Sequence, residues 1–276
     1  MGNRKATLLV LPATVISFFV VVGGLLAALM QSLGLLPFAG PPTLNSSAYL
    51  TVAPDLPSAV ALSFGIAAAS TLIAVIFGFV TAMLVMRGRF GGRLIAMVST
   101  WSIPFPHLVG AASMGLLLGD AGFLARIFGT DSWPELVGGP AWIAVIAAYS
   151  WKESAFVALV VTGVLLTRAT AYDETAALLG AGRLRRLRHV LVPLSLPALG
   201  VSATIVFVYV FGSYEVAWLL GRPYPEPLPV MALRLFSSAS LSSRPEAAAL
   251  AVVTTIVALG AAGLAALALR RVPLWQ

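Results

Sequence analysis

Residues 173–193 read DETAALLGAGRLRRLRHVLVP, a charged stretch in a chain otherwise dominated by long apolar segments. One apolar run ends near residue 167, before this stretch, and another begins near residue 196, after it. Charged side chains are costly inside a bilayer, so the stretch is expected to lie outside the hydrocarbon. There it can present a folded surface to a soluble partner.

The residue types within this stretch predict two short helices joined by an elbow. Asp173 is a good helix N-cap, and the next residue places a second carboxylate in the first turn, where the helix dipole favours negative charge. Gly180 allows a sharp turn or a close approach of the backbone. A second helix, with leucines at helical spacing, is expected to begin at Arg183 and to be ended by Pro193 and Pro197.

The composition places the chain in a membrane. Its 276 residues are 59% hydrophobic and 10% charged, whereas soluble domains carry about 25% charged residues. Lipid requires each span to satisfy its own backbone hydrogen bonds, which leaves helices or closed barrels. The apolar runs here have the length of helices. The sequence therefore predicts an all-α integral membrane protein, and the absence of cysteine excludes disulfides and cysteine nucleophiles.

Six apolar segments each have roughly the length needed to cross a bilayer. They are residues 7–30, 58–86, 94–118, 141–167, 196–221 and 246–269. The first is longer than the apolar part of a signal peptide, about 7–15 residues, and is expected to be a retained span. Pro104 and Pro106 are expected to break or kink the third. We therefore expect six transmembrane helices.

The basic residues predict the orientation of these spans. In a six-span arrangement, 12 of the 17 Lys and Arg residues fall on one side, namely Arg4, Lys5, Arg87, Arg89, Arg93, Arg168, Arg183, Arg185, Arg186, Arg188, Arg270 and Arg271. Lys and Arg are enriched in cytoplasmic loops, so both termini are expected in the cytoplasm. The same segregation explains the net charge of +7 without a nucleic-acid partner.

The opening stretch resembles the EAA loop of ABC-transporter permeases, the membrane components of binding-protein-dependent importers. That loop reads E-A-A, three residues, Gly, nine residues and I-x-L-P. The matching residues here are Glu174, Ala176, Gly180, Val190 and Pro193, while Thr175 and Val192 depart from the pattern. The resemblance implies that residues 173–189 form a coupling helix that enters a groove on an ATPase. The residues expected to serve this coupling are Asp173, Glu174, Ala176, Ala177, Gly180, Arg183, Arg185, Arg186 and Pro193.

Further motifs extend the resemblance over roughly residues 58–269. Residues 151–156, WKESAF, are similar to a W-K-x-x-x-F stretch that precedes the EAA loop. Residues 211–216, FGSYEV, and 220–225, LGRPYP, resemble the branch that imports polyamines, opines, phosphonates and ferric ions. The implied architecture is a MetI-like five-helix permease core at 58–269, with the coupling helix within 173–193. An N-terminal transmembrane helix and outer loop at 1–57 precede the core, and a cytoplasmic tail at 270–276 follows it.

The resemblance also implies partners. They are a second permease subunit, expected to be a different chain, two ATP-binding-cassette ATPase subunits and an extracytoplasmic substrate-binding protein, at a bacterial inner membrane. The chain itself is expected to be neither an enzyme nor a cofactor carrier, with ATP and Mg²⁺ on the ATPase. Its only lysines, Lys5 and Lys152, lie outside any G-x-x-x-x-G-K-[ST] motif. The expected substrate is a small charged solute, and a sugar importer is the alternative, since sugar permeases share the EAA loop.

Four residues are candidates for the solute pathway. Lys152 and Glu153 lie within the fourth span, and Tyr214 and Glu215 lie toward the outer end of the fifth. Ionisable residues in a span are functional candidates, because charge there is costly. In one reading Glu153, Tyr214 and Glu215 line the path of a cationic substrate. The slightly preferred reading is an ion pair between Lys152 and Glu215, or snorkelling of these side chains, and His107 is expected to be a hydrogen-bonded packing residue.

Two other function classes fit a helical membrane protein. A secondary transporter working alone needs a coupling-ion site, and the sparse acidic residues provide no obvious one. An intramembrane hydrolase needs a nucleophile or a metal, but the chain has two histidines and neither H-E-x-x-H nor G-x-S-x-G. A Ser–Lys dyad that uses Lys152 stays open, without support from any other residue. Co-purification of an ATPase separates the importer from both alternatives.

Overall fold

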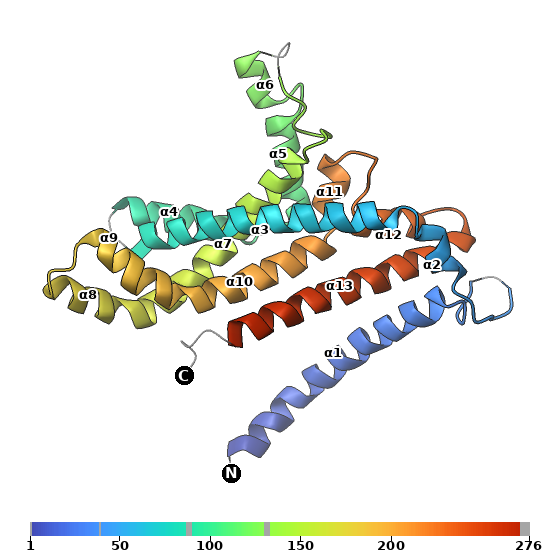
Figure 1. Ribbon diagram of the computed structural model, residues 1–276, viewed down its shortest axis with the longest axis horizontal. Coiled ribbons are helices and arrows are strands. Elements are labelled where there is room, and N and C mark those ends of the chain that lie inside the picture. The colour runs from blue at the N-terminus through green and yellow to red at the C-terminus, as the bar shows by residue number, and fades with distance from the viewer. Residues whose placement is uncertain (1, 39, 87–89, 130–132, 271–276) are drawn as a thin grey trace. The chain divides into compact units, whose positions relative to one another are not determined.

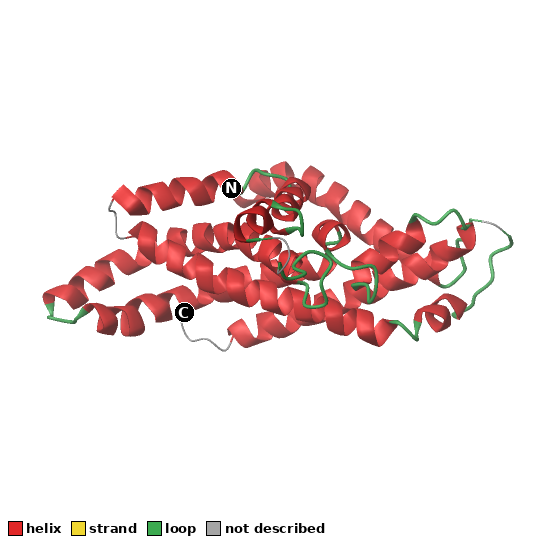
Figure 2. Cartoon of the chain, turned by 90° about the horizontal axis from the view of Figure 1, so that it is seen from above, coloured by secondary structure: helices red, strands yellow, loops and turns green. Residues whose placement is uncertain are grey.

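The computed structural model describes residues 2–38, 40–86, 90–129 and 133–270, and within these ranges it contains helices, turns and loops but no strand (Figures 1 and 2). The chain forms two compact units. One consists of residues 1–60 and 228–256, and the other of residues 61–227 and 257–276. The predicted all-α fold class is confirmed.

The first unit combines the N-terminal helix with helices from the end of the chain. Its elements are α1 (Gly2–Ser32), α2 (Ser47–Val52), α12 (Leu228–Phe236), the short 3-10 helix η3 (Leu241–Ser243) and the first part of α13 (Arg244–Arg270). The hydroxyls of Ser32 and Tyr49 are 2.8 Å apart and join α1 to α2. The Arg244 guanidinium lies 4.2 Å from the centre of the Phe236 ring, a cation–π contact between α13 and α12.

The second unit holds the rest of the helices. They are α3 (Leu56–Met86, from residue 61 onward), α4 (Phe90–Ser102), α5 (His107–Leu118), α6 (Phe123–Phe128), α7 (Ile143–Val164), the π-helical turn η1 (Leu165–Ala169), α8 (Thr170–Leu178), α9 (Arg183–Arg186), the π-helical turn η2 (Leu187–Leu191), α10 (Val192–Gly212) and α11 (Glu215–Leu220). Helix α7 packs against α4, α5, α10 and α11. It is the core of this unit, since 56% of its apolar stretch is buried, against 33% or less for the other apolar helices.

Small residues let other helices approach α7 closely. A Cβ at Gly78 of α3 would lie 2.6 Å from Cβ of Val157, so the backbone of α3 comes directly against the α7 side chains. A Cβ at Gly110 of α5 would lie 3.3 Å from the Trp151 ring. Small residues serve this purpose in membrane proteins because dispersion contacts, and not exclusion from water, hold helices together in lipid.

Among the residues that the structure describes, six helical stretches are long and apolar enough to cross a membrane, in agreement with the predicted number. They are Val10–Ser32, Leu56–Met86, His107–Phe128, Ile143–Thr167, Arg183–Gly212 and Leu241–Arg270. The third differs from the expected 94–118, because α4 ends at Ser102 and α5 begins at His107. Pro104 and Pro106 lie in this gap, as predicted, since proline lacks the N–H that a continuing helix needs.

The fifth span also differs from the expected 196–221. Pro193 and Pro197 do not end a helix, because α9, η2 and α10 run without interruption from Arg183 to Gly212. Pro193 lies in the first turn of α10, directly after the wider π-helical turn Leu187–Leu191. Such a turn relieves the clash between a proline ring and the preceding carbonyls. The helix ends instead at Gly212, and the predicted site residue Glu215 begins the separate helix α11.

Candidate functional site

The stretch quoted first forms the tip of a long helical hairpin. One arm runs through α7, η1 and α8 from Ile143 to Leu178, and the other runs through α9, η2 and α10 from Arg183 to Gly212. The two arms pack against each other along α7 and α10 and again at the tip (Figure 1). We call the connection at residues 179–182 the elbow. Because both arms are unbroken helix, the elbow is joined directly to the buried part of α7.

Gly180 shapes the elbow through its backbone. Its φ of +80° lies in the left-handed region, which side chains with a Cβ rarely adopt. The Gly180 N–H donates to the Ala177 carbonyl at 3.0 Å, and the Ala181 N–H donates to the Ala176 carbonyl at 3.0 Å. This pair of bonds is a Schellman motif, which satisfies the carbonyls at the end of α8. Nothing lies within 4 Å of a Cβ built on Gly180, so conformation, and not space within this chain, requires glycine.

An ion pair joins the two arms beside the elbow. Arg186 Nη1 lies 2.8 Å from Asp173 Oδ2, and each side chain is about a quarter exposed, at 23% and 25%. The predicted N-cap role of Asp173 is wrong, because α8 begins three residues earlier, at Thr170, as a continuation of η1. Asp173 therefore lies inside the first turn of α8, where its carboxylate holds α9.

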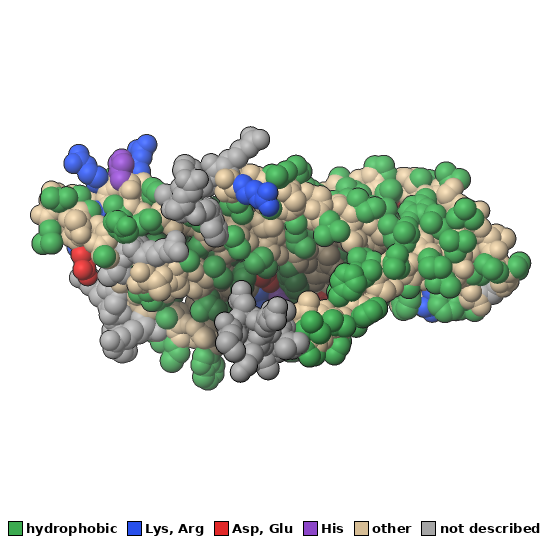
Figure 3. All heavy atoms as spheres, turned by 90° about the horizontal axis from the view of Figure 1, so that it is seen from below, with side chains coloured by type: hydrophobic (Ala, Val, Ile, Leu, Met, Phe, Trp, Pro, Cys, Tyr) green, Lys and Arg blue, Asp and Glu red, His purple; other side chains and the backbone are tan. Residues whose placement is uncertain are grey.

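The rest of the tip is exposed. Leu178, Leu179 and Leu184 are 89%, 82% and 77% exposed. Of the other residues predicted to serve coupling, Glu174, Ala177, Gly180, Arg183 and Arg185 are exposed, and Ala176 and Pro193 are half-buried. Basic side chains project at this end of the unit (Figure 3). Exposed leucines bordered by charged side chains are typical of a surface that binds another protein.

A groove lies beside the tip. Its volume is about 740 Å³. The apolar residues that line it include Phe79, Met83 and Met86 of α3 and Leu184, Leu187 and Leu191 of the second arm. Asp173, Arg183 and Arg186 add charge to its wall. The tip thus carries apolar surface both on the elbow and inside this groove.

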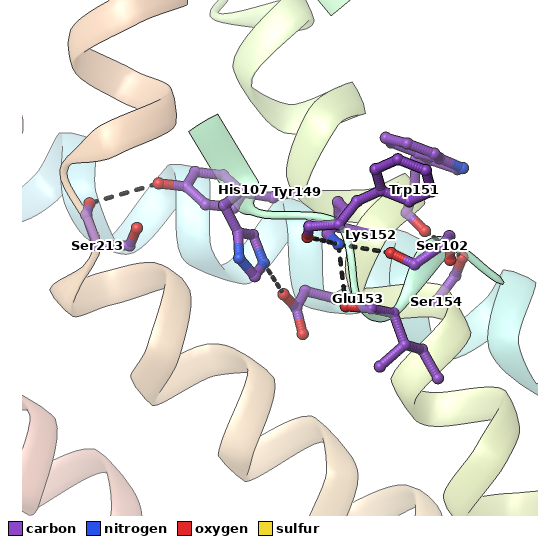
Figure 4. Close-up of polar contacts among 10 residues, drawn as sticks. Ser102, His107, Tyr149, Trp151, Lys152, Glu153, Ser154 and Ser213 are labelled. Carbon is purple, nitrogen blue, oxygen red and sulfur yellow. Dashed lines mark hydrogen bonds and ion pairs between the residues drawn. The ribbon is translucent and has the colours of Figure 1, made fainter. Parts of the chain in front are cut away.

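The pathway candidates lie deeper in the unit, beside the break between α4 and α5. Lys152 Nζ donates to the carbonyls of Ser102 and Phe105, each at 2.6 Å (Figure 4). The last carbonyls of a helix have no partner within the helix. Lys152, which is only 6% exposed, supplies that partner from α7. The preferred ion pair between Lys152 and Glu215 is therefore wrong, because the ammonium group binds main-chain oxygens instead.

Glu153 has a different partner, on the other side of the same break. Its Oε1 lies 3.0 Å from Nε2 of His107, the first residue of α5 (Figure 4). The His107 ring also packs on Tyr209 of α10, with ring centres 4.8 Å apart. The prediction of a hydrogen-bonded packing histidine is thus correct, but the sequence did not identify its partners. Glu153 and Tyr209 are remote from His107 in the chain, and no local pattern links them.

The break between α10 and α11 supplies a second polar point near α7. The Tyr149 hydroxyl donates to the Ser213 carbonyl at 3.4 Å (Figure 4). Glu215 follows as the first residue of α11 and is half-buried, and Tyr214 is 41% exposed. The structure therefore brings Lys152 and Glu153 to the α4–α5 break, and it places Tyr214 and Glu215 at the α10–α11 break. Backbone interrupted at membrane depth is tolerated where it is buried in protein or lines a cavity.

The comparisons with known proteins agree with this architecture. Residues 74–272 match the family described as binding-protein-dependent transport system inner membrane component. The chain belongs to this family. That membership confirms the resemblance drawn from the EAA loop.

Individual relatives differ in what their names say they transport. The putrescine transport system permease protein PotI of Escherichia coli (strain K12) is 31% identical over 209 residues, which cover 75% of this chain and 69% of the relative. The probable sulfate transport system permease protein cysT of Marchantia polymorpha is 28% identical, with 66% of this chain and 63% of the relative covered. The chain therefore spans somewhat less than two thirds of the sulfate relative.

A solved structure shares the fold over nearly the whole chain. It is a bacterial ABC transporter involved in the import of the acidic polysaccharide alginate, with a TM-score of 0.75 and 18% identity, and the similarity covers 98% of each chain. At this identity the similarity supports the fold alone. It includes the N-terminal part of the chain, which the family match does not.

Proposed function

We propose that this chain is the non-enzymatic permease subunit of an ATP-driven, binding-protein-dependent importer. It forms the solute pathway across the membrane and couples that pathway to a separate ATPase through residues 173–189. The family membership supports the permease role. The observation that carries the coupling role is the elbow, where a left-handed glycine, a Schellman motif and the Asp173–Arg186 pair hold three exposed leucines at the tip of the hairpin.

The proposed assembly contains further chains. They are a second permease subunit of different sequence, two ATP-binding-cassette ATPase subunits that bind ATP and Mg²⁺, and an extracytoplasmic substrate-binding protein. The six apolar helices and the family both support a multi-pass inner-membrane protein. The distribution of Lys and Arg supports cytoplasmic termini and a cytoplasmic elbow.

The proposed substrate is a small charged solute, and we infer a cationic one. Glu153 and Glu215 place two carboxylates at the two helix breaks, whereas the nearest ammonium group, that of Lys152, is engaged by main-chain carbonyls. Two carboxylates, with tyrosines nearby, favour a cation over an anion such as sulfate. The putrescine relative is consistent with this choice, because its name specifies a cationic substrate.

The test begins with the tagged chain purified from its own membranes with the ATPase that accompanies it, identified by its sequence and its ATP hydrolysis. The double change Leu178→Ala with Leu179→Ala removes apolar surface from the tip of the hairpin. It is expected to weaken ATPase retention by about tenfold or more, since burial of two leucine side chains contributes several kcal/mol. Leu159→Ala is the matched control, because Leu159 is also exposed, at 56%, but lies on α7 away from the tip.

The control variant is expected to retain the ATPase at the wild-type level. Normal retention in the elbow variant would contradict coupling through residues 173–189. Absence of any ATPase from the wild-type preparation would contradict the importer itself and would favour a transporter working alone.

A further inference from the structure

Two adjacent charged residues of α7 bind the two ends of one helix break. Lys152 contacts the carbonyls of Ser102, at the end of α4, and of Phe105, within the break, and Glu153 contacts His107 at the start of α5 (Figure 4). The side chains of neighbouring helix residues point in directions about 100° apart, so two of them seldom contact the same neighbouring segment. Lys152 and Glu153 both contact the segment between α4 and α5, because this segment passes alongside α7.

The charge of Lys152 matches the helix end that it faces. A helix presents partial negative charge on its last carbonyls and partial positive charge on its first N–H groups. The ammonium of Lys152 meets the last carbonyl of α4, and the carboxylate of Glu153 meets the ring of His107, the first residue of α5. An apolar pair at these positions would pack in the core but would leave the α4 carbonyls without a partner. Besides burying two charges, the two side chains therefore hold the two sides of the break.

The same helix leads to the elbow. From Glu153, the chain continues as uninterrupted helix through η1 and α8 to Leu178. Helix α5 also lies tightly on α7, since a Cβ at Gly110 would approach the Trp151 ring to 3.3 Å and Lys152 Cδ to 3.6 Å. Continuous helix thus joins the elbow to the residues that hold the break.

We propose that Lys152 and Glu153, with His107, form a clamp that fixes the angle between α4 and α5 and makes the break move with the α7–α8 rod. They are positioning residues for transport, because they act through the break between α4 and α5. The transport consequence rests on the proposed importer function. The geometric consequence does not, because it concerns this chain alone.

The geometric test exploits the absence of cysteine from the chain. Cysteines introduced at Trp101 of α4 and Leu116 of α5, which are 70% and 76% exposed, carry spin labels on either side of the break. The distribution of label-to-label distances is measured by pulsed electron paramagnetic resonance on the full chain in lipid nanodiscs. Lys152→Met is expected to broaden that distribution, and Lys152→Arg, which keeps a cation with several donors, is expected to restore it.

The matched control is Ser154→Ala. Ser154 lies on the same helix, next to the clamp, but its hydroxyl donates within α7 to the Trp151 carbonyl at 2.8 Å. This variant is expected to leave the distribution unchanged. Should Lys152→Met fail to accumulate in the membrane, His107→Phe, which keeps a ring but removes the Nε2 that contacts Glu153, tests the other end of the clamp with the same labels. An unchanged distribution in the variant tested would overturn the clamp.

The functional test uses the complete transporter in proteoliposomes. Lys152→Met is expected to lower solute transported per ATP hydrolysed by about tenfold or more, the change associated with one charge-assisted interaction of this kind. ATPase retention is expected to stay normal, because the elbow is intact. A broadened distribution with an unchanged transport ratio would overturn the positioning role. Loss of the ATPase from the wild-type complex would instead contradict the proposed function. The distance measurement alone would then show whether the clamp fixes the angle between α4 and α5.

Discussion

Replacing Gly180 by alanine is expected to destabilise the elbow through its backbone. At φ +80°, with no atom within 4 Å of the position of a Cβ, the cost comes from conformation and not from a clash. A residue with a Cβ in the left-handed region costs about 1–2 kcal/mol. That free energy corresponds to about a 5- to 30-fold shift away from the closed elbow.

Gly182 provides the matched control two residues away. It also has no atom within 4 Å of a Cβ, but its φ of −64° is accessible to any residue. Gly182→Ala is therefore expected to cost less than Gly180→Ala, with only the preference for glycine over alanine at the N-cap of α9 opposing it. Gly180→Asn is expected to fall between glycine and alanine, since asparagine tolerates the left-handed region better than other residues do.

The assay has a local and a functional part. Hydrogen exchange of the amides at residues 180 and 181, which donate the two Schellman bonds, reports the opening of the elbow directly. The affinity of the wild-type ATPase is expected to fall by at most the same factor, because the ATPase must select the closed form. Equal effects of Gly180→Ala and Gly182→Ala would refute the reasoning, because they would show that space, and not φ, governs the elbow. Gly180→Asp tests space at the ATPase interface and is expected to uncouple transport from ATP hydrolysis.

Two further predictions concern topology and the pathway. Reporter fusions at Leu44 and Leu228 are expected to lie outside and fusions at Gly91 and Arg185 inside, and reversal at any of these sites would contradict the orientation taken from the Lys and Arg distribution. Glu215→Gln is expected to lower uptake of a cationic solute by about tenfold, as one charge-assisted contact predicts, with unchanged thermal stability because Lys152 has other partners. Full uptake would remove Glu215 from the pathway.

Local sequence determined the class of fold, the number of spans and the place of the elbow. Hydropathy over one helix length is sufficient to identify a span, because in lipid the backbone of each span must form its hydrogen bonds within that span. Gly180 marked the turn for a similar reason, since the left-handed conformation is a property of a single residue. Pro104 and Pro106 likewise predicted the break between α4 and α5, because the missing N–H is local.

Tertiary structure decided how that break is stabilised and which charges meet. Lys152 lies 50 residues from Ser102 in sequence, and its partners are main-chain carbonyls, which every residue carries and no residue type reveals. The sequence therefore suggested an ion pair between Lys152 and Glu215. In the structure, α4 and α5 pack on α7, and Lys152 binds main-chain carbonyls instead. Tertiary structure also decided that Pro193 and Pro197 do not end the helix. A π-helical turn precedes Pro193, and the helix continues to Gly212. Charge in lipid must find a partner, but only the assembled helices determine which one.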